Sequence, residues 1–259
     1  MALARRQLEE QVIELSHRLG RERWVANHDG NITARLANGC FLATPTALAK
    51  LAVDRASLIV VDDQAKLVSG SRPPFSELAL HLAVYRHRPD VQAVIHAHPP
   101  SATGLSVAGI PVRTTMLAEP VVSLGAEIPL VPYAAPKTPE WTGNMIPLLD
   151  DADALLLEQH GVLTYGPDLE TAFLRMELVE HLAKIQIAAH QAGLVRDIPD
   201  ADVGKLLGAR TKTGLGKAAR QASAEAPPAR ATAATGGASA PGERVESIIV
   251  EEIGRALRE

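Results

Sequence analysis

The chain has 259 residues, of which 46% are hydrophobic and 22% are charged, and its formal net charge is −4. This composition fits one sizeable folded core, and a 3% aromatic content without a basic excess excludes a nucleic-acid surface built on stacking platforms. The one cysteine, Cys40, excludes an internal disulfide, no apolar run could span a bilayer, and the first residues lack a signal peptide's apolar segment, so we expect a cytoplasmic protein without membrane contact.

The first part of the chain predicts one helix followed by strands. Apolar residues at helical spacing over 8–19 predict an amphipathic helix, with Gly20 as its expected stop. A turn at Asp29–Gly30 then leads into a strand. A returning strand is expected over 41–46, and a further strand over 57–62.

A second helix is predicted over 76–88, with Ser76 as its N-cap. Glu77 falls in the first turn, where the helix dipole favours a carboxylate. His81 lies one turn later between apolar neighbours, and we interpret it as a packing or surface residue. The apolar segment 91–98 follows as a short buried strand, which two prolines close.

The second half of the chain alternates helices and strands. The expected elements are a small helix over 101–107, a strand over 128–133, a helix over 139–149, a buried strand over 154–160 that continues through 161–165 beyond a glycine bend, and a long helix over 168–191. This order predicts an α/β protein with a mixed sheet and helices on both faces.

Three histidines at the ends of buried strands indicate a metal site. Because side chains alternate along a strand, His96 and His98 project to the same side. His160 ends the second buried strand beside Gly161, which permits close backbone approach. Three imidazoles with an open fourth position are the ligand set expected of a catalytic zinc ion.

Five segments, taken in order, resemble the class II (zinc-dependent) sugar-phosphate aldolase/adducin-head family, and within it the fuculose-phosphate aldolases. They are Gly30–Arg35, Ala43–Thr46, Ser76–Glu77, Arg88–His98 and Gln159–Gly161, and the resemblance covers about residues 5–195. It implies a three-layer α/β/α sandwich around a mixed, largely antiparallel sheet, assembled as a homotetramer with sites at subunit interfaces. It also implies one Zn²⁺ per subunit on His96, His98 and His160. The adducin-like structural members lack these ligands, which favours an enzyme.

The activity that the resemblance implies is metal-dependent cleavage of a ketose 1-phosphate. An L-fuculose or L-rhamnulose 1-phosphate would give dihydroxyacetone phosphate and lactaldehyde, with Glu77 as proton shuttle and zinc as Lewis acid. Asn31, Thr46, Ala47 and Ser76 match the positions that bind phosphate in the family. A pentulose-phosphate 4-epimerase or a methylthioribulose-phosphate dehydratase of the same family stays open, as does a non-catalytic interaction protein stabilised by metal.

The chain departs from the family pattern at three places. Ala47 stands where glycine is usual, and Phe75 stands where a second phosphate-binding serine is usual, with Arg72 or Ser71 as candidate replacements. The segment 114–119 lacks the tyrosine that protonates the leaving aldehyde in the fuculose-phosphate aldolases. Tyr133 and Tyr165 are the other candidates for that step, although we expect Tyr133 to pack at a strand end.

The C-terminal part predicts a separate function. We divide the chain into an aldolase domain (1–215), a flexible Ala/Pro/Gly-rich linker (216–242) and an amphipathic helix (243–259). The last two resemble the encapsulation peptides that direct enzymes into bacterial microcompartments. They imply a shell protein as partner and the microcompartment lumen as an alternative location to the open cytoplasm.

Overall fold

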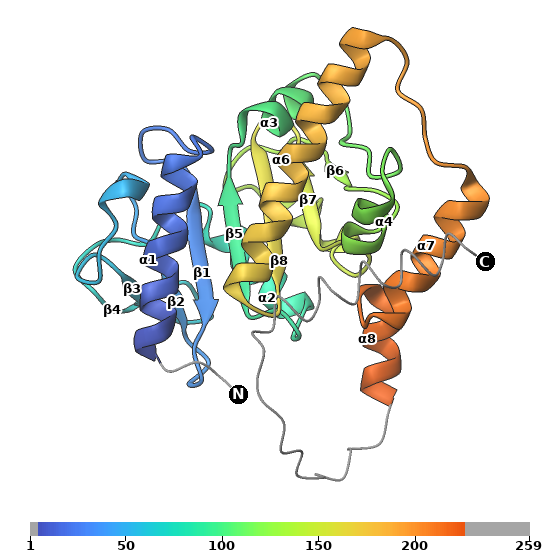
Figure 1. Ribbon diagram of the computed structural model, residues 1–259. Helices are drawn as coiled ribbons and strands as arrows, with labels where there is room; N and C mark the ends of the chain where they lie inside the picture. The colour runs from blue at the N-terminus through green and yellow to red at the C-terminus, as the bar shows by residue number, and fades with distance from the viewer. Residues whose placement is uncertain (1–4, 226–259) are drawn as a thin grey trace.

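The computed structural model describes residues 5–225, which form an eight-stranded sheet with helices on both faces (Figure 1). The strands are β1 (Asn31–Arg35), β2 (Phe41–Ala43), β3 (Ile59–Val61), β4 (Leu67–Ser69), β5 (Ala93–Ala97), β6 (Leu130–Val131), β7 (Ala154–Leu157) and β8 (Gly161–Gly166). Their order across the sheet is β4-β3-β2-β1-β5-β8-β7-β6. All neighbours pair antiparallel except β6 and β7, which pair parallel. The mixed, largely antiparallel sheet is therefore confirmed.

The helices form the two outer layers. They are α1 (Arg5–Arg21), α2 (Leu78–His87), α3 (Pro100–Val107), α4 (Ala118–Leu124), α5 (Pro139–Gly143), α6 (Leu169–Ala192), α7 (Asp200–Lys212) and α8 (Gly216–Glu225), with short 3₁₀ turns η1 (Lys50–Ala52) and η2 (Ile146–Leu148). One hydrophobic cluster lies between the sheet and α1, α3 and α6, and a second between the sheet and α2 and α5. This arrangement confirms the three-layer α/β/α sandwich.

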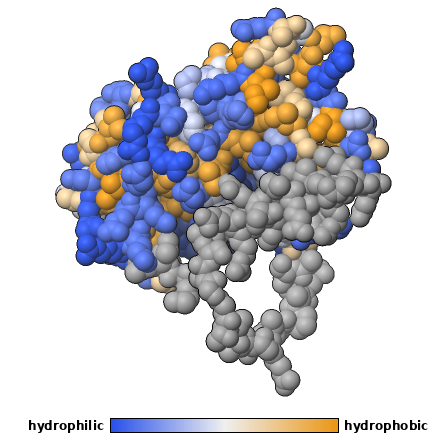
Figure 2. All heavy atoms as spheres, viewed as in Figure 1, coloured by the Kyte–Doolittle hydropathy of each residue, from blue (hydrophilic) through white to orange (hydrophobic). Residues whose placement is uncertain are grey.

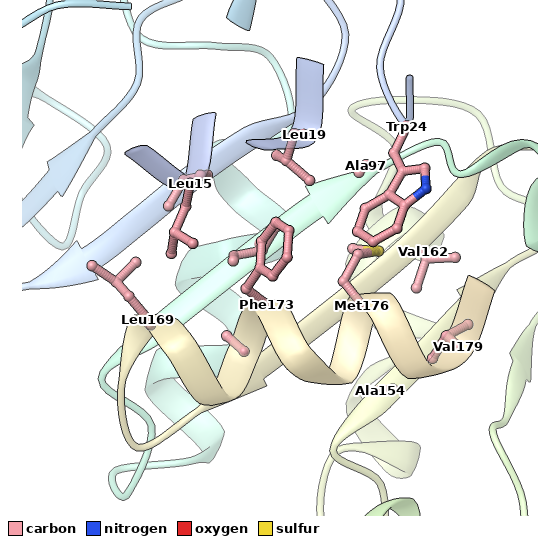
Figure 3. Packing of buried hydrophobic residues seen from close by; sticks show 14 of the residues in the cluster. Leu15, Leu19, Trp24, Ala97, Ala154, Val162, Leu169, Phe173, Met176 and Val179 are labelled. Carbon is pink, nitrogen blue, oxygen red and sulfur yellow. The ribbon is translucent and has the colours of Figure 1, made fainter. Parts of the chain in front are cut away.

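The first cluster joins the N-terminal helix to the long helix α6. Trp24 stacks on Phe173 of α6, with ring centroids 5.6 Å apart, and Leu15, Leu19 and Met176 surround the pair (Figure 3). Each of these side chains is at most 3% exposed, so each contributes roughly 1.5–3 kcal/mol of burial free energy. This packing fixes the segment that leads into β1.

Two helix ends differ from the prediction. Gly20 lies inside α1, where a Cβ atom would come within 2.7 Å of Leu51 Cγ, so this glycine permits close packing and does not end the helix. The N-cap of α2 is Glu77, and neither it nor Ser76 makes the predicted side-chain cap bond. The long helix agrees with the prediction, because Asp168 caps α6 by accepting a hydrogen bond from Thr171 N.

Two other regions are built differently from the sequence prediction. The segment 161–165 is a new strand that turns back antiparallel on β7, whereas the sequence predicts a continuation of the same strand. The helix expected over 139–149 is divided into α5 and η2, and Pro147 in η2 has no amide hydrogen with which to continue an α-helix.

Asp153 joins the C-terminal helices to the core. This carboxylate is 1% exposed and lies within 3.2 Å of guanidinium nitrogens of Arg88, Arg175 and Arg210 and 3.5 Å from Arg220. Arg210 belongs to α7 and Arg220 to α8. The guanidinium groups hold the pKa of Asp153 well below its usual range although burial alone would raise it.

The predicted linker (216–242) therefore begins with helix α8, so that the ordered chain extends past the expected boundary at residue 215. The rest of that linker, and the amphipathic helix expected over 243–259, lie outside the described residues. None of the helices within residues 5–225 is long and apolar enough to cross a bilayer.

Candidate metal centre and active site

His96 and His98 present their rings to the same point at the end of β5. The Nδ1–H of His96 donates to Val162 O at 2.9 Å, which leaves its Nε2 without a proton when the ring is neutral. That Nε2 lies 2.9 Å from Nε2 of His98, and the two ring centroids are 4.8 Å apart. The second ring is oriented by Asp29, whose Oδ2 is 3.3 Å from His98 Nδ1.

His160 reaches the same point from the tight turn between β7 and β8. Gln159 adopts a left-handed backbone conformation with φ of 53°, and this turn directs the following imidazole toward β5. The His160 ring centroid lies 4.6 Å from that of His96 and 5.2 Å from that of His98.

Gly161 makes this approach sterically feasible. A Cβ atom on Gly161 would lie 2.5 Å from His98 Cδ2, 2.6 Å from Ala97 O and 3.2 Å from His96 Cε1. Every other residue type would therefore collide with the strand that carries the two histidines.

The three imidazoles fit a divalent metal ion. One ring nitrogen from each lies within 4.8 Å of the other two. The facing Nε2 atoms of His96 and His98 and a ring nitrogen of His160 could each donate a lone pair to a common ion. His96 is fully buried, whereas His98 and His160 are partly exposed, so the centre is open on one side. The arrangement leaves room for a ligand to complete the coordination.

The electrostatics of the cluster favour the neutral, metal-binding form of the rings. Burial and the neighbouring imidazoles lower the pKa of His96 well below its ordinary value, and the same causes lower the pKa of His98. Metal binding at neutral pH therefore does not have to displace protons from these two rings.

Glu77 faces the cluster from the start of α2. Its Oε2 accepts a hydrogen bond of 2.6 Å from Asn31 Nδ2, and its Oε1 lies 3.7 Å from His160 Nε2. Burial alone would raise the pKa of Glu77, but His160, His96 and Asn31 together lower it to about 2. The side chain is thus an oriented carboxylate at neutral pH that can accept a proton beside the metal centre.

The four residues expected to bind phosphate are only partly brought together. Asn31 is buried and joins Glu77, and its Oδ1 has no hydrogen-bond partner within residues 5–225. Thr46 is half-buried, Ala47 follows it with a left-handed φ of 53°, and Ser76 is exposed next to Glu77. The positive φ explains on physical grounds why glycine would suit position 47.

The expected departures have structural counterparts. Phe75 is 7% exposed and packs in the second cluster, with its ring 5.2 Å from that of His81, so it serves the core. Tyr165 is fully buried and donates its hydroxyl to Ala152 O at 2.9 Å, so it is not free to act on a substrate. Tyr133 is 56% exposed, and the expectation that it packs at a strand end is wrong.

Two residues near the site are functional candidates that the sequence does not identify. The sequence places Asp29 only in a turn, although its carboxylate lies 3.3 Å from His98 Nδ1, and a lysine amid apolar residues is the one signal for Lys50, which is 3% exposed. His81 is fully buried with its Nδ1 2.8 Å from Thr33 Oγ1, so its interpretation as a packing residue is confirmed.

Comparison with known proteins is consistent with this geometry. The family profile described as "Class II Aldolase and Adducin N-terminal domain" matches residues 10–187. A solved structure of an L-fuculose 1-phosphate aldolase superposes with a TM-score of 0.73 at 26% identity, over 80% of this chain and 97% of that one.

Curated relatives have several different activities. The L-fuculose phosphate aldolase of Escherichia coli K12 is 32% identical over 184 residues, which cover 70% of this chain and 81% of that protein. The 5-methylthioribulose-1-phosphate/5-deoxyribulose-1-phosphate aldolase of Escherichia coli O45:K1 strain S88 is 30% identical over 76% of this chain and 90% of that one. A 3-oxo-tetronate 4-phosphate decarboxylase of Escherichia coli K12 is 31% identical over 69% of this chain and 85% of that protein.

Proposed function

Because the chain belongs to the class II aldolase and adducin family and is an enzyme of the class II aldolase type, we propose that it cleaves a ketose 1-phosphate of the L-fuculose or L-rhamnulose type. The products would be dihydroxyacetone phosphate and lactaldehyde. The observation that supports this proposal best is the convergence of three imidazoles and the Glu77 carboxylate on one open point.

We propose His96, His98 and His160 as ligands of one Zn²⁺ per subunit. When bound, the ion would supply Lewis-acid polarisation of the substrate's carbonyl group. The chain's own groups prepare this site: Val162 O fixes the ring of His96, and Asp29 fixes the ring of His98.

Glu77 is proposed to carry the proton. Breaking the carbon–carbon bond requires that the fragment retaining the phosphate gain a proton at carbon while the other fragment loses one from its hydroxyl group. The hydrogen bond from Asn31 holds the Glu77 carboxylate in place. As a carboxylate, Glu77 would first take the proton that the hydroxyl group loses and then deliver it to carbon, so that the two transfers balance. Asn31, Thr46, the backbone amide of Ala47 and Ser76 are proposed to hold the phosphate.

The test is a coupled assay for dihydroxyacetone phosphate release over a panel of ketose 1-phosphates, with and without a chelator. We expect Zn²⁺ to restore the activity that chelation removes. Glu77→Gln should lower kcat by about 10²–10⁴-fold, whereas Glu177→Gln, on the exposed side of α6, should not change it. Release that is insensitive to chelation, or no release from any ketose 1-phosphate, would contradict the proposal.

A second candidate substrate is 5-deoxyribulose 1-phosphate or its 5-methylthio analogue, which the similarly identical relative favours. The same assay separates the two candidates by which ketose 1-phosphate of the panel is cleaved, because dihydroxyacetone phosphate is the product detected in both cases. Carbon dioxide release would point instead to the decarboxylase activity of another relative.

We also propose that this enzyme assembles as a homotetramer. Val107, Ile110, Leu117 and Leu194 are large apolar side chains that are at least 39% exposed, and Figure 2 shows apolar surface over the region where α3 and the end of α6 lie. This surface supports a homotetramer, which light scattering tests.

For residues 243–259 we propose a role in binding a microcompartment shell protein. Deletion of 226–259 should preserve activity and abolish co-purification with shell proteins. Unchanged association would reject that role.

A further inference from the structure

Lys50 is a buried cation whose partners are backbone carbonyl groups. The residue begins η1 and is 3% exposed. Its Nζ donates to Leu48 O at 3.0 Å and lies 3.5 Å from His28 O. Within residues 5–225 no ion pair joins this ammonium group to a carboxylate.

These surroundings leave the ammonium group incompletely compensated. Two carbonyl oxygens face a group with three N–H donors. Burial lowers the pKa of Lys50 to about 8, while the carboxylates of Asp29 and Glu77 act in the opposite direction. A buried cation without a contacting counterion is unfavourable, and an anionic ligand arriving nearby would relieve that cost.

Lys50 lies beside the proposed phosphate-binding residues. Through Leu48 it holds the loop that carries Thr46 and Ala47, and through His28 it holds the turn that precedes Asn31. The four donors proposed for phosphate are neutral, the buried Phe75 adds none, and the candidate replacement Arg72 is exposed. Besides the proposed metal ion, the buried Lys50 is therefore the positive charge that would favour a phosphate dianion at this place.

We infer that Lys50 is a positioning and specificity-determining residue, which shapes the 46–49 loop and provides the positive charge that favours a phosphorylated substrate. The inference rests on the proposed function, because it assigns the phosphate to the same site. Lys50 acts through the loop and its charge and touches no reacting atom.

The experiment compares Lys50→Met and Lys50→Arg with Lys205→Met, a control that removes a surface lysine paired with Asp202 at 3.4 Å. Calorimetry measures binding of inorganic phosphate to each zinc-loaded protein. Kinetics then give kcat and KM for a ketose 1-phosphate and for the unphosphorylated ketose.

For Lys50→Met we expect phosphate affinity to fall at least about tenfold. KM should rise only for the phosphorylated substrate, with zinc content unchanged. Lys50→Arg should recover most of the affinity, and Lys205→Met should equal the parent protein. If Lys50→Met does not fold, Lys50→Gln replaces it.

The inference is overturned if phosphate binds the parent and the Lys50→Met protein equally well, or if the parent protein binds no phosphate. It is also overturned if Lys50→Met weakens both substrates alike, because that result would indicate a structural role only. Loss of phosphate affinity in a protein that cleaves no ketose 1-phosphate would support the anion site and reject the proposed aldolase function.

Discussion

Replacing Gly161 by alanine should weaken zinc binding by a mechanism that differs from a general loss of fold stability. The new Cβ atom would lie 2.5 Å from His98 Cδ2 and 2.6 Å from Ala97 O, whereas ordinary contacts begin at 3.4 Å. The missing space is therefore about 0.9 Å at His98, and one neighbour is backbone that cannot rotate away. Either the β7–β8 turn or the ring of His98 has to move by roughly that distance.

A shift of this size exceeds what a zinc site tolerates. Metal–nitrogen distances in such sites vary by about 0.2 Å, so a ring displaced by most of an ångström no longer binds well. We expect zinc affinity to fall at least about 10–100-fold, and activity to fall by about 10². Overpacking should also lower the unfolding free energy of the metal-free protein by about 1–3 kcal/mol.

The assay is competition for zinc against a chelator of known affinity, together with urea unfolding of the metal-free protein. Gly166→Ala is the matched control, because Gly166 ends the same strand and its Cβ atom would crowd Thr171 at 3.1 Å and touch no histidine. This control should lose stability and keep its zinc affinity. A Gly161→Ala protein that binds zinc as tightly as the parent protein would refute the reasoning.

Three further predictions concern the charges around the site and the core. Asp153→Asn should lower the unfolding free energy by about 3–5 kcal/mol in urea, because it leaves buried guanidinium groups unpaired, whereas exposed Asp151→Asn should change it by less than about 0.5. Asp29→Ala should weaken zinc binding about 10–100-fold in chelator competition while metal-free stability stays within about 0.5 kcal/mol, since His98 loses its orienting partner. Burial lowers the pKa of His81 to about 3, compared with 6.5 in the unfolded chain, so the unfolded state binds the extra proton and stability is lost as the pH falls from 6.5 toward 3. In urea titrations, His81→Gln should make this loss of unfolding free energy shallower by about 1.4 kcal/mol per pH unit. An unchanged slope would show that His81 is not held neutral.

The sequence was most informative where local periodicity and final burial coincide. The alternation along the predicted strand 91–98 places His96 and His98 on one side, and the apolar spacing over 168–191 predicts the long helix α6 within one residue at each end. These features depend on neighbours along the chain, so the sequence contains them directly.

The features that were missed depend on distant neighbours. Gly161 looked like a bend within one strand, because nothing local indicates that Gln159 adopts a positive φ and reverses the chain. The strand β4 is exposed at the sheet edge and has no apolar pattern to identify it. Lys50 is buried only because the turn 26–29 and the loop 46–49 close over it, which is a property of the tertiary fold.

The two sides of the site are held by different kinds of interaction, and this difference predicts where substrate choice resides. Backbone fixes the metal side: Val162 O orients His96, and the reversal at Gln159 and Gly161 places His160. Single substitutions at this reversal should therefore weaken metal binding at least about 10–100-fold. On the phosphate side, Asn31 is buried at the start of β1, but Thr46, Ala47 and Ser76 are half-buried or exposed residues outside the strands and helices. The ammonium group of Lys50 holds only the 46–49 loop and the turn at His28. Loops tolerate substitution better than paired strands do, so changes around 46–50 should alter which phosphorylated substrate is used while the metal chemistry is retained.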